Sequence, residues 1–293
     1  MAEISMQGKI CLITGATSGI GKATALGLAR AGANVVLVAR NTEQGETIRT
    51  EIRNQSGNEA IELLIADLSS QVAIRQLAHA FLARHQTLHV LINNAGVMMG
   101  QRSTTVDGIE TMLAVNYLAP FLLTNLLLTV IKASAPARII NVASVPVNVK
   151  INFADLQANR KYSGFGQYQH TKLALVLFTY ELARRLQGTG VTVNCLHPGT
   201  VGTNILRNPP PLIGLAAKIP LASLIFISPE RGAETSLYLA TAPEVEQVTG
   251  KYFIKKKEAR SAKESYDEQV AQRLWRVSEE MTQLSHQDVA PNP

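Results

Sequence analysis

Short, mostly apolar runs alternate with longer amphipathic stretches along most of the chain. The runs cover residues 10–14, 35–39, 61–65, 90–93, 138–142, 191–196 and 252–254. Continuous apolar sequence is typical of parallel strands that are covered on both faces. The stretches between the runs repeat apolar residues three and four positions apart, which is the helical period. The pattern therefore predicts an α/β fold, with a doubly wound parallel sheet of about seven strands and helices on both faces.

A glycine-rich turn, Thr14 to Gly21, joins the first run to the first predicted helix. Glycines let the backbone approach an anion closely, and the helix N-terminus offers free N–H groups and a positive dipole end. The spacing G-x-x-x-G-x-G differs from the G-x-G-x-x-G of other dinucleotide-binding turns. Placed after the first strand, the turn predicts a Rossmann-type fold and a pyrophosphate site. The residues assigned to that site are Gly15, Thr17, Ser18, Gly19, Ile20 and Gly21.

The end of the second run indicates which dinucleotide is bound. It reads Val38-Ala39-Arg40 and carries no carboxylate, the group that binds the ribose 2′-hydroxyl in NAD-selective versions of this fold. The planar guanidinium of Arg40 suits a 2′-phosphate instead, and Lys22 is a candidate for a second cation there. We therefore expect NADP(H). The alternative is that Arg40 only solvates the strand end.

A tyrosine and a lysine, Tyr168 and Lys172, lie four residues apart in a helical pattern that runs to about Gln187. Residues i and i+4 share one face of a helix, so the ammonium lies near the phenol. We expect the cation to lower the phenol pKa from about 10 and to make Tyr168 a general acid/base. A second copy of the motif, 252–256, begins on a predicted strand. Positions four apart are separated there by about 13 Å, so this copy is excluded.

Further polar residues lie at the ends of neighbouring strands, where open α/β sheets place their sites. Ser144 follows the fifth run, and its hydroxyl can stabilise a developing alkoxide. Asn94 follows the fourth run, in the segment 93–96. Asn116 lies in the helical stretch after it, where a buried amide needs hydrogen-bond partners.

These residues together resemble the short-chain dehydrogenase/reductase family over about residues 8–254, and within it the retinol dehydrogenase-like branch. The family motifs are the turn at 14–21, Asp67, Asn-Asn-Ala-Gly at 93–96, Asn116, Ser144, Tyr168, Lys172 and Pro198-Gly199. The branch is indicated by the segments 153–156, 181–186, 197–201, 250–253 and 273–275. Residues 145–148 depart from the usual branch sequence, which leaves the substrate preference open.

The resemblance implies a role for each site residue. Tyr168 is the general acid/base, Lys172 binds the nicotinamide ribose, Ser144 orients the substrate oxygen and Asn116 holds a proton-relay water. Further cofactor contacts are implied for Asp67, Leu68, Asn94, Ala95, Gly96, Pro198, Gly199, Val201 and Thr203. The implied reaction is hydride transfer between NADP(H) and the carbonyl or alcohol carbon of a hydrophobic small molecule, such as a retinal-like aldehyde. The alternative is a non-catalytic NADP(H)-binding regulatory or membrane-surface protein on the same fold.

Composition narrows the picture further. The 293 residues are 46% hydrophobic and 17% charged, which supports a large core. The net charge is +6, but no basic stripe is interleaved with aromatic residues, so we expect no nucleic-acid partner. Cys11 and Cys195 lie in apolar runs, so we expect core residues, no metal site and a reducing, cytoplasmic compartment. Lys218 and Pro220 interrupt the longest apolar stretch, which argues against a transmembrane helix.

The predicted organisation is one Rossmann-type catalytic domain over residues 1–257, followed by a helical extension and tail over 258–293. The segment at about 204–228 is the predicted substrate lid, because its apolar sequence suits a hydrophobic substrate. Peripheral contact with a membrane surface and packing in the core are the alternatives for this segment. The resemblance also implies a homo-oligomer formed through the Tyr168 helix.

Overall fold

The computed structural model describes residues 5–145, 149–199, 206–207 and 227–285, which form an α/β fold around one sheet. This sheet has eight strands in the order β10-β9-β7-β6-β4-β1-β2-β3. Their bounds are β1 (Ile10–Thr14), β2 (Asn34–Ala39), β3 (Ile61–Ile65), β4 (Val90–Asn93), β6 (Ala137–Val142), β7 (Val191–His197), β9 (Lys251–Ile254) and β10 (Lys257–Ala259). All neighbours are parallel except β9 and β10. The predicted Rossmann-type class is confirmed, and β10 is an addition to the seven predicted strands.

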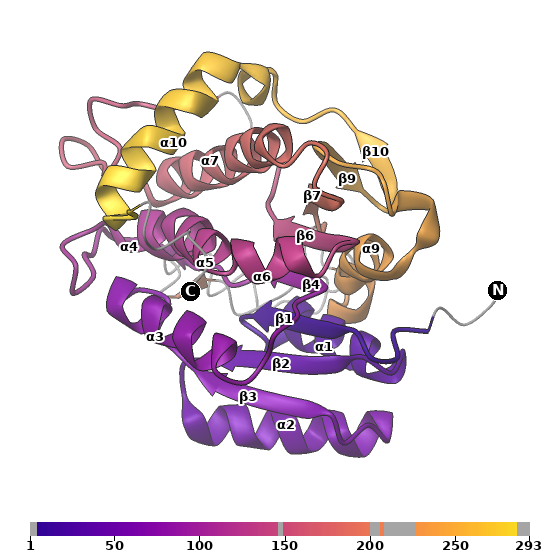
Figure 1. Ribbon diagram of the computed structural model, residues 1–293. Helices are drawn as coiled ribbons and strands as arrows, with labels where there is room; N and C mark the ends of the chain where they lie inside the picture. The colour runs from indigo at the N-terminus through magenta and orange to yellow at the C-terminus, as the bar shows by residue number, and fades with distance from the viewer. Residues whose placement is uncertain (1–4, 146–148, 200–205, 208–226, 286–293) are drawn as a thin grey trace.

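Helices cover both faces of the sheet, as Figure 1 shows. Successive strand residues point to opposite faces, so Leu12 joins one apolar cluster while Cys11 and Ile13 join the other. The cluster of Cys11 includes side chains of α1 (Gly19–Arg30), α2 (Thr42–Ser56) and α9 (Pro229–Thr241). The cluster of Leu12 includes side chains of α3 (Gln71–Leu82), α5 (Ala119–Leu126), α6 (Leu128–Ala133), α7 (Gly164–Arg185) and α10 (Glu268–Thr282). The doubly wound arrangement is thereby confirmed.

Short elements complete the chain. They are β5 (Met98–Met99), which pairs with β8 (Leu206–Arg207), α4 (Thr111–Leu113), the π-helical turn η1 (Ala114–Leu118) and the 3₁₀ turns η3 (Pro243–Val245) and η4 (Lys263–Tyr266). Apart from residues 206–207 and 227–228, the predicted lid lies outside the described residues. Among the described helices, none is long and apolar enough to cross a membrane.

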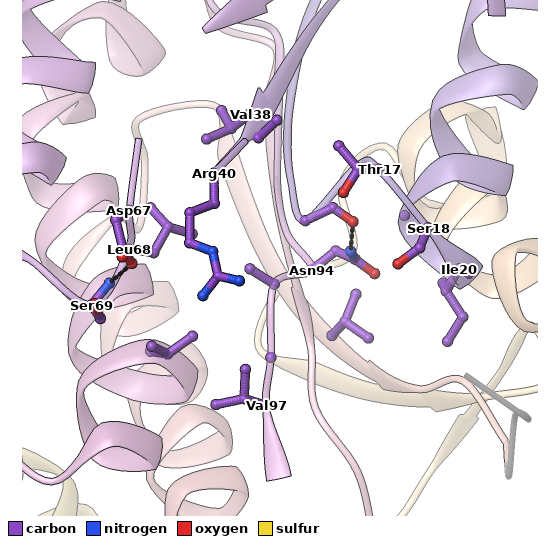
Figure 2. Close-up of a pocket in the computed structure, with 18 of the residues that line it drawn as sticks. Thr17, Ser18, Ile20, Val38, Arg40, Asp67, Leu68, Ser69, Asn94 and Val97 are labelled. Carbon is purple, nitrogen blue, oxygen red and sulfur yellow. Dashed lines mark hydrogen bonds between the residues drawn. The ribbon is translucent and has the colours of Figure 1, made fainter. Parts of the chain in front are cut away.

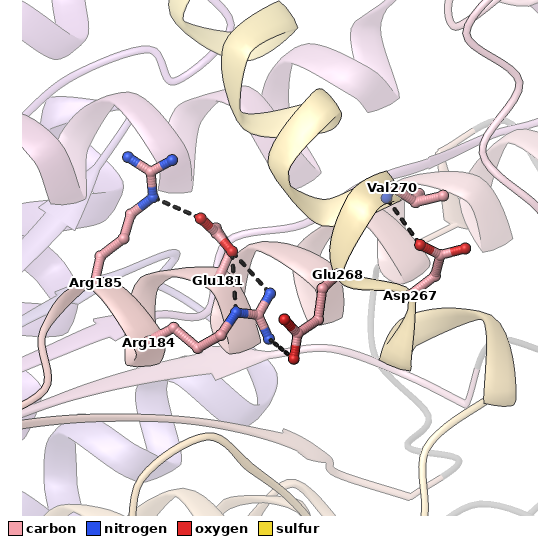
Figure 3. Close-up of polar contacts among 6 residues, drawn as sticks. All are labelled: Glu181, Arg184, Arg185, Asp267, Glu268 and Val270. Atoms are coloured by element: carbon pink, nitrogen blue, oxygen red, sulfur yellow. Dashed lines mark hydrogen bonds and ion pairs between the residues drawn. The ribbon is translucent and has the colours of Figure 1, made fainter.

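The C-terminal helix α10 packs against α7, and Figure 1 draws it on the side of α7 away from the sheet. Trp275 of α10 lies edge-on against Phe121 of α5, with ring centroids 5.0 Å apart. A polar cluster lies beside this contact (Figure 3). There, Glu181 accepts hydrogen bonds from Arg184 and Arg185, and Arg184 lies 3.7 Å from Glu268 of α10. The outer side of α7, through which the resemblance implies oligomer formation, is thus occupied by the chain's own helix.

Candidate active site

A cavity of about 600 Å³ opens at the carboxyl ends of β1, β2, β4 and β6. Most of the predicted cofactor residues line it: Gly15, Thr17, Ser18, Gly19, Ile20, Gly21, Arg40, Asp67, Leu68, Asn94, Ala95, Gly96, Tyr168, Lys172 and Pro198. Figure 2 shows how several of them surround the cavity. Gly199 directly follows the lining residue Pro198, whereas Val201 and Thr203 lie outside the described residues. The sequence did not single out Val97, Met99 and Val115, which add apolar surface to the wall.

The glycine turn has the geometry that its sequence predicts. Gly15 has φ +65°, and a Cβ there would lie 2.8 Å from the Cα of Ala95. A Cβ at Gly21 would collide with the carbonyl oxygen of Gly15 and with the side-chain amide of Asn94. Larger residues therefore cannot occupy these two positions without moving the turn. The two glycines thus let the turn pack closely against the end of β4.

Asn94 and Thr14 fasten the end of β4 to this turn. The side-chain amide of Asn94 donates to the carbonyl oxygens of Thr14, at 2.9 Å, and Gly15, at 3.1 Å. The hydroxyl of Thr14 in turn accepts from the backbone N–H groups of Asn94 and Ala95, both at 3.0 Å. The amide of Asn94 thus braces the turn. The sequence analysis included Thr14 in the turn but did not predict this contact, although a hydroxyl residue at the end of a buried strand is a usable signal.

The N-terminus of α1 has no side-chain cap, a feature that it shares with α5 and α6. Its N-cap residue, Ser18, makes no side-chain capping hydrogen bond, and the first turn contains no acidic residue. The N-termini of other helices are capped by the side chains of Asn41, Ser70, Ser163, Ser228 and Asp267. Free N–H groups and a positive helix end therefore face the cavity at Ser18. This fits a bound pyrophosphate, which would accept those hydrogen bonds.

Arg40 is an exposed cation at the end of β2, on the wall of the cavity. Figure 2 shows its guanidinium pointing into the cavity between Asp67 and Asn94. Within the described part of the chain, this guanidinium has no hydrogen bond and no ion pair. The amine of Lys22 lies 2.6 Å from a carboxylate oxygen of Glu51 on α2. Lys22 is not among the residues that line the cavity, and its role as a second cation stays a prediction.

Tyr168 and Lys172 lie one turn apart on α7, as predicted. The amine of Lys172 is 5.7 Å from the ring centroid of Tyr168 and donates to the carbonyl oxygen of Val142 at 2.8 Å. Burial lowers the pKa of Lys172 to about 8. Burial also raises the pKa of Tyr168, and a hydrogen bond with the side chain of Ser144 opposes this rise. The structure thus corrects the expected lowering of the Tyr168 pKa, since desolvation of the phenolate is the largest effect.

Asn116 is fully buried in the π-helical turn η1, where the sequence predicted a regular helix. Its side-chain amide donates to the carbonyl oxygen of Val97 at 2.9 Å and to the hydroxyl of Thr171 at 3.1 Å. Its side-chain oxygen accepts from the N–H of Val97 at 2.8 Å. The side chain thus ties the segment after β4 to α7, beside Lys172. The proton-relay water stays a prediction.

The second tyrosine motif does not form a tyrosine–lysine pair. Tyr252 lies on β9, while the amine of Lys256 lies 3.2 Å from Glu234. The hydroxyl of Tyr252 instead donates to the backbone carbonyl oxygen of Ser144 at 2.9 Å. The exclusion of residues 252–256 as a catalytic pair agrees with this geometry. The sequence analysis missed the contact with Ser144, because it depends on the lateral order of the strands.

Two histidines lie near the site. His197 ends β7, and its buried Nδ1 has no hydrogen-bond partner among the described residues. Burial lowers its pKa, and the nearby charge of Lys172 lowers it further. The pKa of His170 is also lowered by burial, because this side chain is partly covered rather than fully solvated. Both histidines are therefore expected to be neutral at pH 7.

Comparison with known proteins agrees with this geometry. Residues 9–211, which contain the glycine turn and the Tyr168–Lys172 pair, match the sequence profile described as short chain dehydrogenase. The chain belongs to the short-chain dehydrogenase family. Its fold and its strand-end cavity are therefore those of an oxidoreductase that acts on CH–OH groups.

Relatives of this short-chain dehydrogenase include two retinol dehydrogenases. Retinol dehydrogenase 12 of Mus musculus is 46% identical over 280 residues, which cover 95% of this chain and 88% of the relative. Retinol dehydrogenase 13 of Homo sapiens is 43% identical over 301 residues, covering 100% and 90%. A solved structure of the Pseudomonas aeruginosa RhlG/NADP active-site complex has a TM-score of 0.69 at 29% identity, covering 86% and 96%. The dehydrogenase is therefore retinol dehydrogenase-like in sequence.

Proposed function

We propose that this short-chain dehydrogenase transfers hydride between NADP(H) and the carbonyl or alcohol carbon of a hydrophobic small molecule, with retinal-like aldehydes as the substrate class. The observation that carries the cofactor assignment is Arg40. Its guanidinium points into the cavity from the end of β2, where a carboxylate would select NAD, and no described residue pairs with it. The NADP complex of a structural relative supports the same assignment.

The residues around the cavity divide the recognition of NADP(H) between them. Arg40 pairs with the 2′-phosphate, since a planar guanidinium can donate two parallel hydrogen bonds. The uncapped N-terminus of α1 at Ser18 binds the pyrophosphate. Asp67 and Leu68 line the adenosine side of the same cavity. Val201 and Thr203, for which the resemblance implies cofactor contacts, complete the proposed site.

Tyr168, Ser144 and Lys172 carry out the proton transfer that accompanies hydride transfer. The bound cofactor supplies or accepts the hydride. In carbonyl reduction, Tyr168 donates its phenolic proton to the substrate oxygen as the hydride adds to the carbon. The hydroxyl of Ser144 donates a hydrogen bond to the same oxygen and stabilises its developing charge. Lys172, whose pKa is about 8, stays largely protonated at pH 7 and favours the phenolate that remains. Alcohol oxidation reverses these steps.

A lipophilic substrate suits the wall of the cavity and the relatives of the chain. Val97, Met99 and Val115 line its apolar part. Both named relatives are retinol dehydrogenases. A hydrophobic aldehyde would be held by this apolar surface and oriented by the few polar groups at the strand ends.

The cofactor assignment is tested by Arg40→Ala. We expect NADPH affinity to fall on the order of ten- to a hundred-fold, as for the loss of charge-assisted hydrogen bonds, while NADH affinity changes less than about two-fold. Arg84→Ala is the matched control, because Arg84 is exposed just beyond the end of α3 and does not line the cavity. Equal losses for NADPH and NADH would contradict a role in reading the phosphate.

The reaction is tested with purified protein, NADPH and a panel of lipophilic aldehydes that includes all-trans-retinal. Oxidation of NADPH that depends on the aldehyde is the expected result. Tight NADPH binding without turnover of any aldehyde would favour the non-catalytic alternative. Co-sedimentation with liposomes in the absence of redox activity would favour a membrane-surface protein.

The proposal extends to compartment and assembly. Cys11 and Cys195 are buried free thiols, which agrees with a reducing, cytoplasmic setting. Peripheral membrane contact through the segment 204–228 remains part of the proposal. A homo-oligomer would have to use a surface other than the side of α7 that α10 covers. Sedimentation of the full-length chain measures the assembly directly.

A further inference from the structure

Tyr252 is a buried tyrosine that the proposed reaction does not use. It lies on β9, in register with Cys195 of the neighbouring strand β7. Its side chain is only 2% exposed. Its hydroxyl donates to the backbone carbonyl oxygen of Ser144 at 2.9 Å, and Ser144 follows β6, which lies on the other side of β7. This buried hydroxyl therefore has one specific partner, the residue whose side chain faces Tyr168.

The backbone of Ser144 lies beyond the last hydrogen bonds that join β6 to its neighbours in the sheet. β6 ends at Val142, and the last ladder-like bond runs from the N–H of Ala143 to the carbonyl oxygen of Leu196 at 2.8 Å. Among the described residues, no other hydrogen bond to the backbone of Ser144 accompanies the one from Tyr252. Within the described part of the chain, the bond from Tyr252 is thus the hydrogen bond that fixes the carbonyl of Ser144. Fixing this carbonyl restricts rotation about the Cα–C bond of Ser144, and so limits how far the serine backbone and the Cβ that it carries can shift.

We propose that Tyr252 is a positioning residue of the active site, whose hydroxyl fixes the Ser144 carbonyl and thereby aims the Ser144 side chain at Tyr168 and the substrate oxygen. The inference rests on the proposed function, because Ser144 acts on the substrate only if the cavity performs the reaction. Tyr252 touches neither substrate nor cofactor in this scheme. It acts through Ser144 alone.

If Tyr252 positions Ser144, removal of its hydroxyl should change the pKa of Tyr168, which the loss of a merely structural contact would not do. The hydrogen bond between the side chains of Ser144 and Tyr168 lowers the pKa of Tyr168 against the effect of burial. If Ser144 turns away, this stabilisation of the phenolate is lost and the pKa of Tyr168 rises. Ser144 has a single O–H, which bonds Tyr168 in the free enzyme and the substrate oxygen in the complex. The shift to higher pH is therefore expected in the profile of kcat/KM for alcohol oxidation, which reports the free enzyme and needs the phenolate as base.

The test is Tyr252→Phe, which removes one oxygen atom and keeps the buried ring. We expect kcat to fall about ten-fold, as for the loss of one hydrogen bond in the transition state, with an alkaline shift of the oxidation profile. The KM for NADP(H) should stay within about two-fold of wild type. Tyr180→Phe is the matched control. Tyr180 is a buried tyrosine whose hydroxyl lies 2.7 Å from that of Ser261, away from the cavity.

A double-mutant cycle with Ser144→Ala decides whether Tyr252 acts through Ser144. If it does, Tyr252→Phe has almost no further effect on kcat in the Ser144→Ala background. Equal losses in both backgrounds, or the same loss in Tyr180→Phe, would overturn the proposal, as would an unchanged kcat and pH profile in Tyr252→Phe. The proposed function fails separately, when the wild type turns over no aldehyde or when Ser144→Ala keeps full activity.

Discussion

The chain contains the pattern Tyr-x-x-x-Lys twice, and the two copies differ in backbone structure and in the contacts of their side chains. At 168–172 the pattern lies on α7, where positions four apart are about 6 Å apart along the axis, and both side chains line one cavity. At 252–256 it begins on β9 and continues beyond the strand into the turn before β10. There the amine of Lys256 lies 3.2 Å from Glu234, and the hydroxyl of Tyr252 donates to the backbone carbonyl oxygen of Ser144.

The difference teaches that the backbone gives a short motif its chemistry. Lys172 is 2% exposed and its amine is held by the carbonyl of Val142, so its charge acts at short range in a poorly solvated site. The side chain of Lys256 is 50% exposed, and its ion pair is screened by water. Substitutions in the two copies should therefore differ by orders of magnitude in their effects.

The largest effect is expected for Tyr168→Phe. The variant keeps the ring and removes the group that exchanges the proton, so kcat should fall about 10³-fold, within the range attributed to general acid–base catalysis. NADPH binding, measured by fluorescence titration, should remain within about two-fold of wild type. Tyr180→Phe, on the same helix, is the control and should keep its activity. Aldehyde-dependent turnover near the wild-type rate in Tyr168→Phe would remove Tyr168 from the mechanism.

Lys172→Met probes the burial of the charge through stability. The pKa of Lys172 is about 8 in the folded protein against 10.5 for an ordinary lysine, so between these pH values the unfolded chain binds more protons. The free energy of unfolding should therefore rise with pH across this window. The rise attributable to Lys172 is on the order of 3 kcal/mol, and it should be complete only above pH 10.5.

The measurement is urea unfolding of wild type and Lys172→Met at several pH values from 7.5 to 10. The difference between the two curves isolates Lys172 from the other groups that titrate in this range, including the buried tyrosines. Lys256→Met is the control, because its partly solvated amine has no comparable burial. Parallel curves for wild type and Lys172→Met would show that the ammonium is not penalised by burial.

The contrast between the two copies also shows what the sequence could predict. The strands β1 to β7 of the main sheet follow from continuous apolar runs, and α7 (Gly164–Arg185) follows from its helical period. The polar strand β10 (Lys257–Ala259) carries no such signal, because it pairs only at the sheet edge. The π-turn at Asn116 looks like regular helix in sequence, since π turns need tertiary support.

Of the candidate site, too, only the features with a local sequence signal could be predicted. The spacing of glycines in a turn and side chains four apart on a helix are local features, so Gly15, Gly21 and the Tyr168–Lys172 pair could be found from the sequence. The brace between Thr14 and Asn94 and the contact of Tyr252 with Ser144 join residues 80 and 108 positions apart. Such contacts depend on which strands are neighbours, and a single sequence does not specify that order. The pairing of Lys22 with Glu51 was missed for the same reason.

The smallest effect is expected for Lys256→Met. The ion pair with Glu234 joins two side chains that are each about half exposed, at 3.2 Å, and such pairs contribute roughly 0–1 kcal/mol. The variant should keep kcat and KM within about two-fold, and its unfolding midpoint in urea should barely move. The backbone N–H of Lys256 still donates to the hydroxyl of Thr235, which holds the turn without the amine. A loss of activity near that of Tyr168→Phe would mean that the second copy contributes its cation to the reaction, and the distinction between helix and strand would no longer explain the site.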